Sequence, residues 1–336
     1  MNDTTTRRIQ LAAVPVGEPR TEDFALTTAP IPQPRPGQLL VRNTWMSVDP
    51  YMRQGMRGVP YLPPLAVGDV LYGAAVGEVV DSRAASVPVG VTVTHFAGWR
   101  EHAVVDAASV TVVNPAIAPP ETYLGVLGTT GLTAYATLTD TAPIRTGDVV
   151  FVSAAAGAVG SVAGRLARAF GAATVIGSAG GPDKARRLVT DFGYDTGLDY
   201  RAEPVAGQLA RAAPEGIDYY FDNVGGEQLE AAIDVLRDHG RIAMVGAVST
   251  YNSTEPPRGP ANLHELGAKR ASLHGFLVTD YQHLHPEWIR RGAAWLADGT
   301  LHSEHTVLDG LERAPEALMG VLSGANTGKM LVRLTT

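Results

Sequence analysis

The stretch VVFVSAAAGAVGSV, residues 149–162, decides the fold of this chain. The uncharged apolar run from Val149 to Val152 predicts a strand buried on both faces, and an Ala/Gly turn then leads into a helix-like segment that reaches Phe170. A strand, a tight turn and a helix in this order are typical of the first unit of a dinucleotide-binding domain.

The turn matches the fingerprint G-x-G-x-x-G in part. Ala155 replaces the first glycine, whereas Gly157 and Gly160 stand at the second and third positions. Without a Cβ at residue 157 the backbone can approach a pyrophosphate, and the N–H groups of Ala158, Val159 and Gly160 can bind it. The alternative is a turn that only packs the helix against the strand, and the motif alone leaves both interpretations open.

Length and composition bound the remaining possibilities. A chain of 336 residues with 45% apolar and 18% charged residues can bury two cores. The net charge of -7 argues against nucleic acid or an anionic membrane as a partner. No apolar run reaches the ~20 residues of a membrane span, and no long apolar segment follows the N-terminal arginines, so we expect a cytoplasmic protein without a signal peptide.

Cysteine is absent from the sequence, which excludes disulfides and every metal site with thiolate ligands. Two histidine pairs, His283 with His285 and His302 with His305, lack an evident set of carboxylate partners. We therefore predict no metal site.

Residues 1–125 have the texture of a small, mostly antiparallel barrel or sandwich, because short β-like runs alternate with Pro and Gly. The expected strands are Ile9–Val14, Leu39–Ser47, Val70–Val80, Val91–His95, Glu101–Val105 and Val110–Val113. The loop VDPYMRQGMR, residues 48–57, either lines a cleft or is only a connection.

The texture changes after Pro119, where strand-like and helix-like segments begin to alternate and predict a doubly wound parallel sheet. Helical stretches are expected at Glu121–Leu127, Thr130–Asp140, Asp183–Phe192, Ala206–Ala212, Gly226–Asp238 and His283–Asp298, and strands at Thr174–Gly177, Thr196–Asp199, Ile217–Asp222, Arg241–Gly246 and Ser272–Leu277. The stretch Thr306–Thr336 adds no sensible further unit to that sheet. We expect it to complete the first domain, so that residues 126–298 are an insertion between residues 1–125 and 299–336.

The turn after the second predicted strand favours NADP over NAD. An NAD site places a carboxylate about 20 residues after the glycine turn, but Gly177–Gly180 contains none. Lys184 follows at the helix start nearest the ribose and is a candidate for the 2'-phosphate. We interpret Arg186 and Arg187 as the solvated face of the same helix.

Five motifs in order resemble one family over nearly the whole chain: SVDPYMR (47–53), AAAGAVGSV (154–162), YFDNVGG (220–226), GRIAMVGAVSTYN (240–252) and GANTGKM (324–330). They are similar to the zinc-free medium-chain dehydrogenases and reductases, in the group of leukotriene B4 dehydrogenase, prostaglandin reductase, plant double-bond reductase and curcumin reductase. The resemblance implies an α/β fold with a GroES-like domain, an inserted Rossmann domain, an active-site cleft between them and a homodimer. It also implies NADPH-dependent reduction of the C=C bond of α,β-unsaturated ketones and aldehydes, with hydride transfer to the β-carbon.

The resemblance assigns cofactor contacts to this chain. Gly157 to Gly160 would hold the pyrophosphate, and Lys184 and Tyr200 the 2'-phosphate. The residues that would line the dinucleotide and nicotinamide are Asn223, Gly246, Ala247, Ser249, Tyr251, Phe276, Leu277, Val278 and Asn326.

Reduction of an enone needs a donor to the enolate oxygen and a proton for the α-carbon. Tyr51 and Tyr251 are the catalytic candidates, because a tyrosine hydroxyl can donate a hydrogen bond or a proton. The alternatives are an aromatic wall at Tyr51 and packing on the ribose at Tyr251. Part of the family has a catalytic tyrosine at the position of Ala268, so here the proton donor and the natural substrate are open.

The sequence leaves two other functions possible. A quinone reductase of the zeta-crystallin type would act on quinones but not on simple enones. A relative without turnover would bind NADPH and oxidise none of it. The motifs STYN and SVDPYMR favour the enone group.

Overall fold

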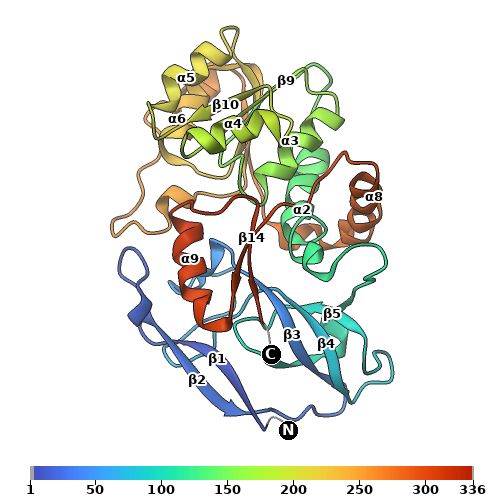
Figure 1. The fold of residues 1–336 in the computed structure, drawn as a ribbon. Coiled ribbons are helices and arrows are strands. Elements are labelled where there is room, and N and C mark those ends of the chain that lie inside the picture. The colour runs from blue at the N-terminus through green and yellow to red at the C-terminus, as the bar shows by residue number, and fades with distance from the viewer. Residues whose placement is uncertain (1–3, 335–336) are drawn as a thin grey trace. The chain divides into compact units, whose positions relative to one another are not determined.

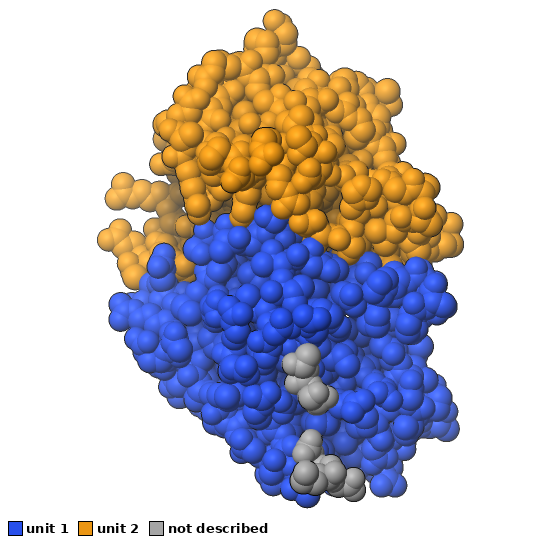
Figure 2. Space-filling view, viewed as in Figure 1, with its two compact units in different colours: residues 1–125, 305–336 blue, residues 126–304 orange. Residues whose placement is uncertain are grey.

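The computed structural model describes residues 4–334, and the chain divides into two compact units (Figure 2). Unit 1 contains residues 1–125 and 305–336, and unit 2 contains residues 126–304. Unit 2 thus extends six residues beyond the boundary expected after residue 298.

Unit 1 is built mostly from antiparallel strands, as its alternating β-like runs predict, although β14 and β15 pair in parallel. Its described strands form no closed barrel. They form a two-stranded sheet, β1-β2, and a seven-stranded sheet in the order β14-β15-β3-β4-β5-β7, with β6 paired to β3 (Figure 1). The bounds are β1 Thr5–Leu11, β2 Phe24–Pro30, β3 Gln38–Ser47, β4 Ala75–Ser82, β5 Thr92–His95, β6 His102–Asp106, β7 Thr111–Val112, β14 His305–Asp309 and β15 Lys329–Arg333.

Strand β2 is absent from the sequence-based expectations. Its sequence, FALTTAP, has one buried residue, Phe24, and Leu26 remains 46% exposed. The strand forms because β1 pairs with it along its whole length, from Thr5 opposite Pro30 to Leu11 opposite Phe24. This edge hairpin therefore has little apolar pattern of its own.

The end of the chain returns to the first sheet. In the sequence, helix α9 (Ala314–Leu322) connects β14 to β15. Strand β15 pairs antiparallel with β3, with Leu331 opposite Ser47. The core of unit 1 contains side chains from both ends of the sequence, including Met46, Trp99, Leu318 and Val332. Short helix α1 (Tyr51–Gly55) follows β3 directly.

Unit 2 contains a six-stranded parallel sheet in the order β10-β9-β8-β11-β12-β13. The strands are β8 Val149–Val152, β9 Thr174–Ala179, β10 Thr196–Asp199, β11 Ile217–Asp222, β12 Leu236–Met244 and β13 Ser272–Gly275; the helices are α2 Thr129–Ala136, α3 Gly160–Ala169, α4 Pro182–Thr190, α5 Val205–Ala212, α6 Gly226–Asp234, α7 Glu265–Ala268 and α8 His285–Ala297. Strands β9 and β10 follow β8 on one side of it in the sheet, and β11, β12 and β13 follow on the other side. The carboxyl ends of β8 and β11 therefore mark the switch point where such sheets bind ligands.

Two helices predicted from sequence are shorter in the structure. The segment predicted as a helix to Asp238 ends at Asp234, because Leu236 pairs with Ile217 and starts β12. The segment predicted as a helix to Asp140 is α-helical only to Ala136, then forms a π-helical turn to Thr141. Thr133 and Thr137 donate to the carbonyls four residues earlier, a pattern that bends helices.

Within residues 4–334, no helix combines the length and the apolarity that a bilayer crossing requires.

Candidate functional site

The glycine turn of unit 2 joins β8 to α3. A Cβ at Gly160 would lie 2.4 Å from the carbonyl oxygen of Ala154, so this position requires glycine for backbone packing. A Cβ at Gly157 would meet only that same oxygen, at 3.1 Å, and would otherwise face open space. The third glycine of the motif thus packs the turn, whereas the second leaves one side of the turn open.

The start of α3 follows the glycine turn directly. The N–H groups of Ala158, Val159 and Gly160 lie at the start of α3, where backbone donors have no acceptor within the helix itself. The helix that follows has ten residues, so its dipole adds to the field of these donors. Backbone N–H groups at the start of a helix can bind a phosphate group, so this turn is a candidate phosphate-binding site.

Hydrogen bonds across the switch point fix the ends of β8 and β11. The backbone N–H of Asn223 donates to Ser153 Oγ at 2.9 Å, and Asn223 Nδ2 donates to the Ser153 carbonyl at 2.8 Å. Asp222 is fully buried, and its Oδ1 accepts the N–H groups of Val224 and Gly225. Burial raises the pKa of Asp222, and these amide bonds oppose the shift.

The loops after the next two strands continue the same edge. Gly246 donates its N–H to the Asp222 carbonyl at 3.0 Å, and Ser249 Oγ donates to the Val224 carbonyl at 2.6 Å. The N–H of Phe276 donates to the carbonyl of Met244, the last residue of β12. Asn223, the loop 246–251 and residues 276–278 therefore follow three adjacent carboxyl ends.

Tyr251 folds back on its own loop. Its side chain is half-buried, and its hydroxyl oxygen accepts the N–H of Ala247 at 3.4 Å. The hydroxyl proton can still be donated, because the backbone bond uses only a lone pair.

Two cations gather beyond the carboxyl ends of β9 and β10. Half-buried Lys184 lies in the first turn of α4; burial lowers its pKa, and the charge of Arg201 lowers it further. The Arg201 guanidinium lies 5.9 Å from the centre of the Tyr200 ring. A Cβ at Gly180 would lie 2.6 Å from Tyr200 Oη and 3.0 Å from Arg201 Nε, so glycine makes room for both side chains.

Arg201 was not singled out from the sequence. Its backbone N–H and that of Gly181 both donate to Asp199 Oδ1, at 3.0 and 2.7 Å, which joins the loops after β9 and β10. The available signal was its place directly after Tyr200, two residues beyond the end of a predicted strand.

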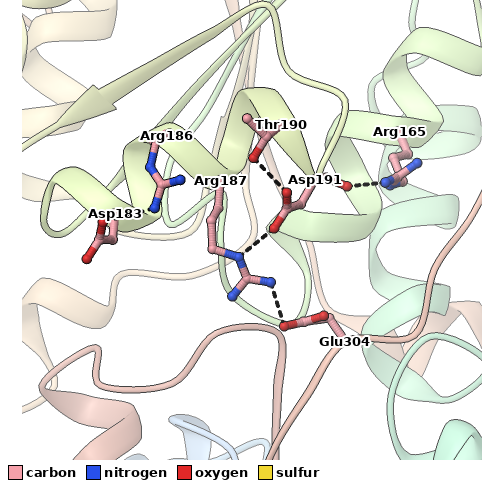
Figure 3. Close-up of polar contacts among 7 residues, drawn as sticks. All are labelled: Arg165, Asp183, Arg186, Arg187, Thr190, Asp191 and Glu304. Atoms are coloured by element: carbon pink, nitrogen blue, oxygen red, sulfur yellow. Dashed lines mark hydrogen bonds and ion pairs between the residues drawn. The ribbon is translucent and has the colours of Figure 1, made fainter.

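The two arginines of α4 are committed to ion pairs (Figure 3). Arg186 pairs with Asp183 at 3.1 Å on the exposed face of the helix. Arg187 pairs with Asp191 at 2.6 Å and with Glu304 at 2.8 Å, so it joins α4 to the end of unit 2. Their contacts lie on the surface of the helix.

Tyr51 is the first residue of α1 in unit 1. It is half-buried and stacks on Phe96 with ring centres 6.1 Å apart, and Phe96 stacks on Tyr72 at 5.4 Å. Burial, and then the charge of Asp49, raise the pKa of Tyr51 well above its ordinary value, opposed by a backbone hydrogen bond at Ala74. Tyr51 is therefore a protonated phenol at neutral pH.

Asn326 and Ala268 are the remaining residues that the sequence analysis singled out. Asn326 donates from Nδ2 to the Gly328 carbonyl at 2.7 Å in the loop before β15. Ala268 is exposed at the end of α7. In the part of the chain that the structure describes, no three His, Asp or Glu side chains form a group that could hold a metal ion.

The strand order, the glycine turn and the switch-point loops define a dinucleotide-binding protein of the doubly wound class. Residues 7–113 match the model described as the N-terminal domain of oxidoreductase, and residues 158–295 match the model described as zinc-binding dehydrogenase.

Full-length relatives make the family more specific. The NADPH-dependent curcumin reductase of Escherichia coli is 38% identical over 334 residues, covering 98% of this chain and 96% of the relative. The NADP-dependent 2-alkenal reductase of Nicotiana tabacum is 35% identical over 340 residues, covering 99% and 98%. The structure of CurA from Vibrio vulnificus in complex with NADPH has a TM-score of 0.92, 38% identity and coverage of 98% and 99%. The chain belongs to the zinc-free group of medium-chain dehydrogenases and reductases.

Two glycine variants separate a ligand-binding turn from a packing turn. Gly160→Ala should lower the free energy of unfolding by about 1–3 kcal/mol, because its Cβ overlaps backbone atoms. Gly157→Ala should change stability little but weaken NADPH binding about tenfold, because its Cβ enters the open side of the turn. Thermal unfolding and fluorescence titration with NADPH measure the two effects. Unchanged NADPH affinity in a folded Gly157→Ala protein would favour the packing interpretation.

Proposed function

We propose that this protein reduces the C=C bond of α,β-unsaturated ketones and aldehydes with NADPH. The full-length likeness to the curcumin reductase of E. coli and the 2-alkenal reductase of N. tabacum carries this proposal. Unit 2 supports the NADPH part of this proposal independently. The backbone N–H groups at the start of α3 and the two neighbouring cations Lys184 and Arg201 fit a phosphorylated dinucleotide.

Different residues of unit 2 would bind different parts of the cofactor. Gly157, Ala158, Val159 and Gly160 would hold the pyrophosphate. Lys184, Tyr200 and Arg201 would hold the 2'-phosphate. The remaining dinucleotide contacts from unit 2 would come from Asn223, Gly246, Ala247, Ser249, Tyr251, Phe276, Leu277 and Val278. Asn326 of unit 1 stays a prediction of the family resemblance.

NADPH, when bound, supplies the hydride that is transferred to the β-carbon of the substrate. Tyr51 is the first candidate to donate a hydrogen bond to the substrate carbonyl oxygen as negative charge develops there. Its raised pKa keeps the hydroxyl proton in place at neutral pH. Tyr251, whose oxygen already accepts a backbone N–H, is the second candidate donor. The α-carbon receives its proton from one of these hydroxyls or from water.

The first experiment is NADPH oxidation with a panel of enones, enals and quinones, followed at 340 nm with product analysis. We expect rapid turnover of enones to the saturated ketones, and a loss of about 100-fold in kcat for Tyr51→Phe. The Tyr251→Phe variant should lose less kcat than Tyr51→Phe if Tyr251 only packs on the ribose of the cofactor. Turnover of quinones alone would favour the quinone reductase alternative, and NADPH binding without oxidation of any substrate would favour a non-catalytic relative.

Cofactor preference tests the cations of unit 2. Lys184→Ala and Arg201→Ala should each raise the KM for NADPH about 10- to 100-fold and leave the KM for NADH unchanged, because each removes a charge-assisted bond to the 2'-phosphate. Arg211→Ala is the matched control, since this exposed arginine pairs with Glu203 at the surface. An equal effect on NADPH and NADH would contradict the assignment.

We also propose a homodimer. Strand β13 is an edge of the parallel sheet, and Leu273 in it is 37% exposed, an edge of the kind that proteins commonly cover by pairing. Leu273→Lys should shift the sedimentation equilibrium toward the monomer. A wild-type chain that sediments as a monomer at micromolar concentration would refute the dimer.

The cytoplasmic location and the independence from zinc remain predictions. The lack of cysteine in the sequence supports zinc independence.

A further inference from the structure

A buried ion pair lies where the two ends of the chain meet in unit 1. Leu331 of β15 stands opposite Ser47 of β3, and continuing this antiparallel register past the end of β3 places Lys329 opposite Asp49. The ammonium and carboxylate groups are in direct contact, and the side chains are only 3% and 12% exposed. The two residues are 280 positions apart in the sequence.

Both oxygens of the Asp49 carboxylate are engaged. Lys329 Nζ contacts Oδ1, and the hydroxyl of Ser47 donates to Oδ2. The same ammonium group also lies 3.5 Å from the carbonyl oxygen of Val48, and the N–H of Val48 donates to the Met330 carbonyl. The segment between β3 and α1 is therefore held by its backbone and its side chains together.

The held segment leads directly into the helix that carries Tyr51. The carbonyl of Asp49 accepts the N–H of Met52 at 3.2 Å, so a hydrogen bond ties Asp49, two residues before α1, to the start of that helix. Pro50 fixes the backbone between Asp49 and Tyr51, with φ near -59°. Tyr51 has little freedom to move while Asp49 stays in place.

A buried ion pair is weak evidence for stability, because desolvation of two charges offsets most of their attraction. The chain has a second such pair, Arg241 with Asp148 at 2.5 Å, with side chains 6% and 7% exposed. That pair lies in unit 2, where it joins the residue before β8 to β12, ten residues before Tyr251. It provides an internal comparison for a purely structural role.

We propose that Asp49 and Lys329 are a positioning pair that fixes Tyr51 as a hydrogen-bond donor to the substrate. This inference rests on the proposed function and gives a role to two residues that lie in the motifs SVDPYMR and GANTGKM without an assigned one. The pair acts through Tyr51 and does not itself touch substrate.

The pair also controls the charge near Tyr51. The groups that bear on the Tyr51 hydroxyl are the Asp49 carboxylate, the Tyr72 phenol and the backbone of Ala74. Lys329 meets the carboxylate from β15. Removal of the Asp49 charge takes away one cause of the raised pKa of Tyr51, so any limb of the pH profile that reports loss of the tyrosine proton should move to lower pH.

The test is a cycle of variants in the full chain. Asp49→Asn with Lys329→Met removes both charges together and leaves no unpaired buried ion. In this double variant we expect kcat for an enone to fall about tenfold or more at unchanged NADPH affinity, because a donor displaced by a fraction of an ångström loses its alignment. Adding Tyr51→Phe should then cost almost nothing further, since the pair acts only through that hydroxyl.

Two further variants complete the cycle. Ser47→Ala keeps both charges and removes one bond to Asp49, so it should give a smaller loss in kcat that also vanishes in the Tyr51→Phe background. Asp148→Asn with Arg241→Met is the matched control and should leave kcat and its pH profile within about twofold of wild type.

Additive losses on combination with Tyr51→Phe, or an unchanged kcat in the folded double variant, would overturn the positioning role. A wild-type chain that reduces no enone would instead refute the proposed function. If the double variant does not fold, the Ser47→Ala cycle decides.

Discussion

The antiparallel pairing of β15 with β3 is the constraint on which the arrangement of this chain depends. It brings residues 329–333 back to residues 45–47 and completes the sheet and core of unit 1 with side chains from both ends of the sequence. Residues 126–304 are consequently inserted within unit 1 rather than appended to it. The same pairing places Lys329 beside Asp49, so the topology of the sheet and the surroundings of Tyr51 have one origin.

In unit 2 the corresponding constraint is the switch point of the parallel sheet. Sheets of this order open a crevice where the strand order reverses, and here Ser153 and Asn223 link the two strand ends at that place. Further hydrogen bonds pass from the loop after β11 to the loop after β12. A ligand that meets this edge meets a set of loops that are already tied to one another, which reduces the cost of ordering them on binding.

Buried polar groups mark the places where this protein departs from an apolar core. Asp222 lies at the switch point, Asp49 and Lys329 lie before the helix of Tyr51, and Asp148 pairs with Arg241 at the start of β8. Each makes hydrogen bonds to backbone or side chains, because an unpaired charge in such a position would be costly. Among the described residues, Asp222 Oδ2 and Arg241 Nε and Nη1 nevertheless have no hydrogen-bond partner. The first two groups adjoin residues that we assign to function, whereas the third joins only structural elements.

The sequence by itself determined the local elements and the class of the fold. Apolar runs such as 149–152 and the glycine turn at 157–160 act over a few residues, so their strand and turn can be recognised without knowledge of partners. The parallel sheet of unit 2 follows from the alternation of such elements, and the motif resemblance led to the family. The tertiary structure decided what depends on pairing between distant residues: the strand β2, the early end of α6, the approach of Arg201 to Lys184, and the contact of Asp49 with Lys329. These features have no local signal, because strand register and loop packing, rather than the pattern of neighbouring residues, bring the groups together.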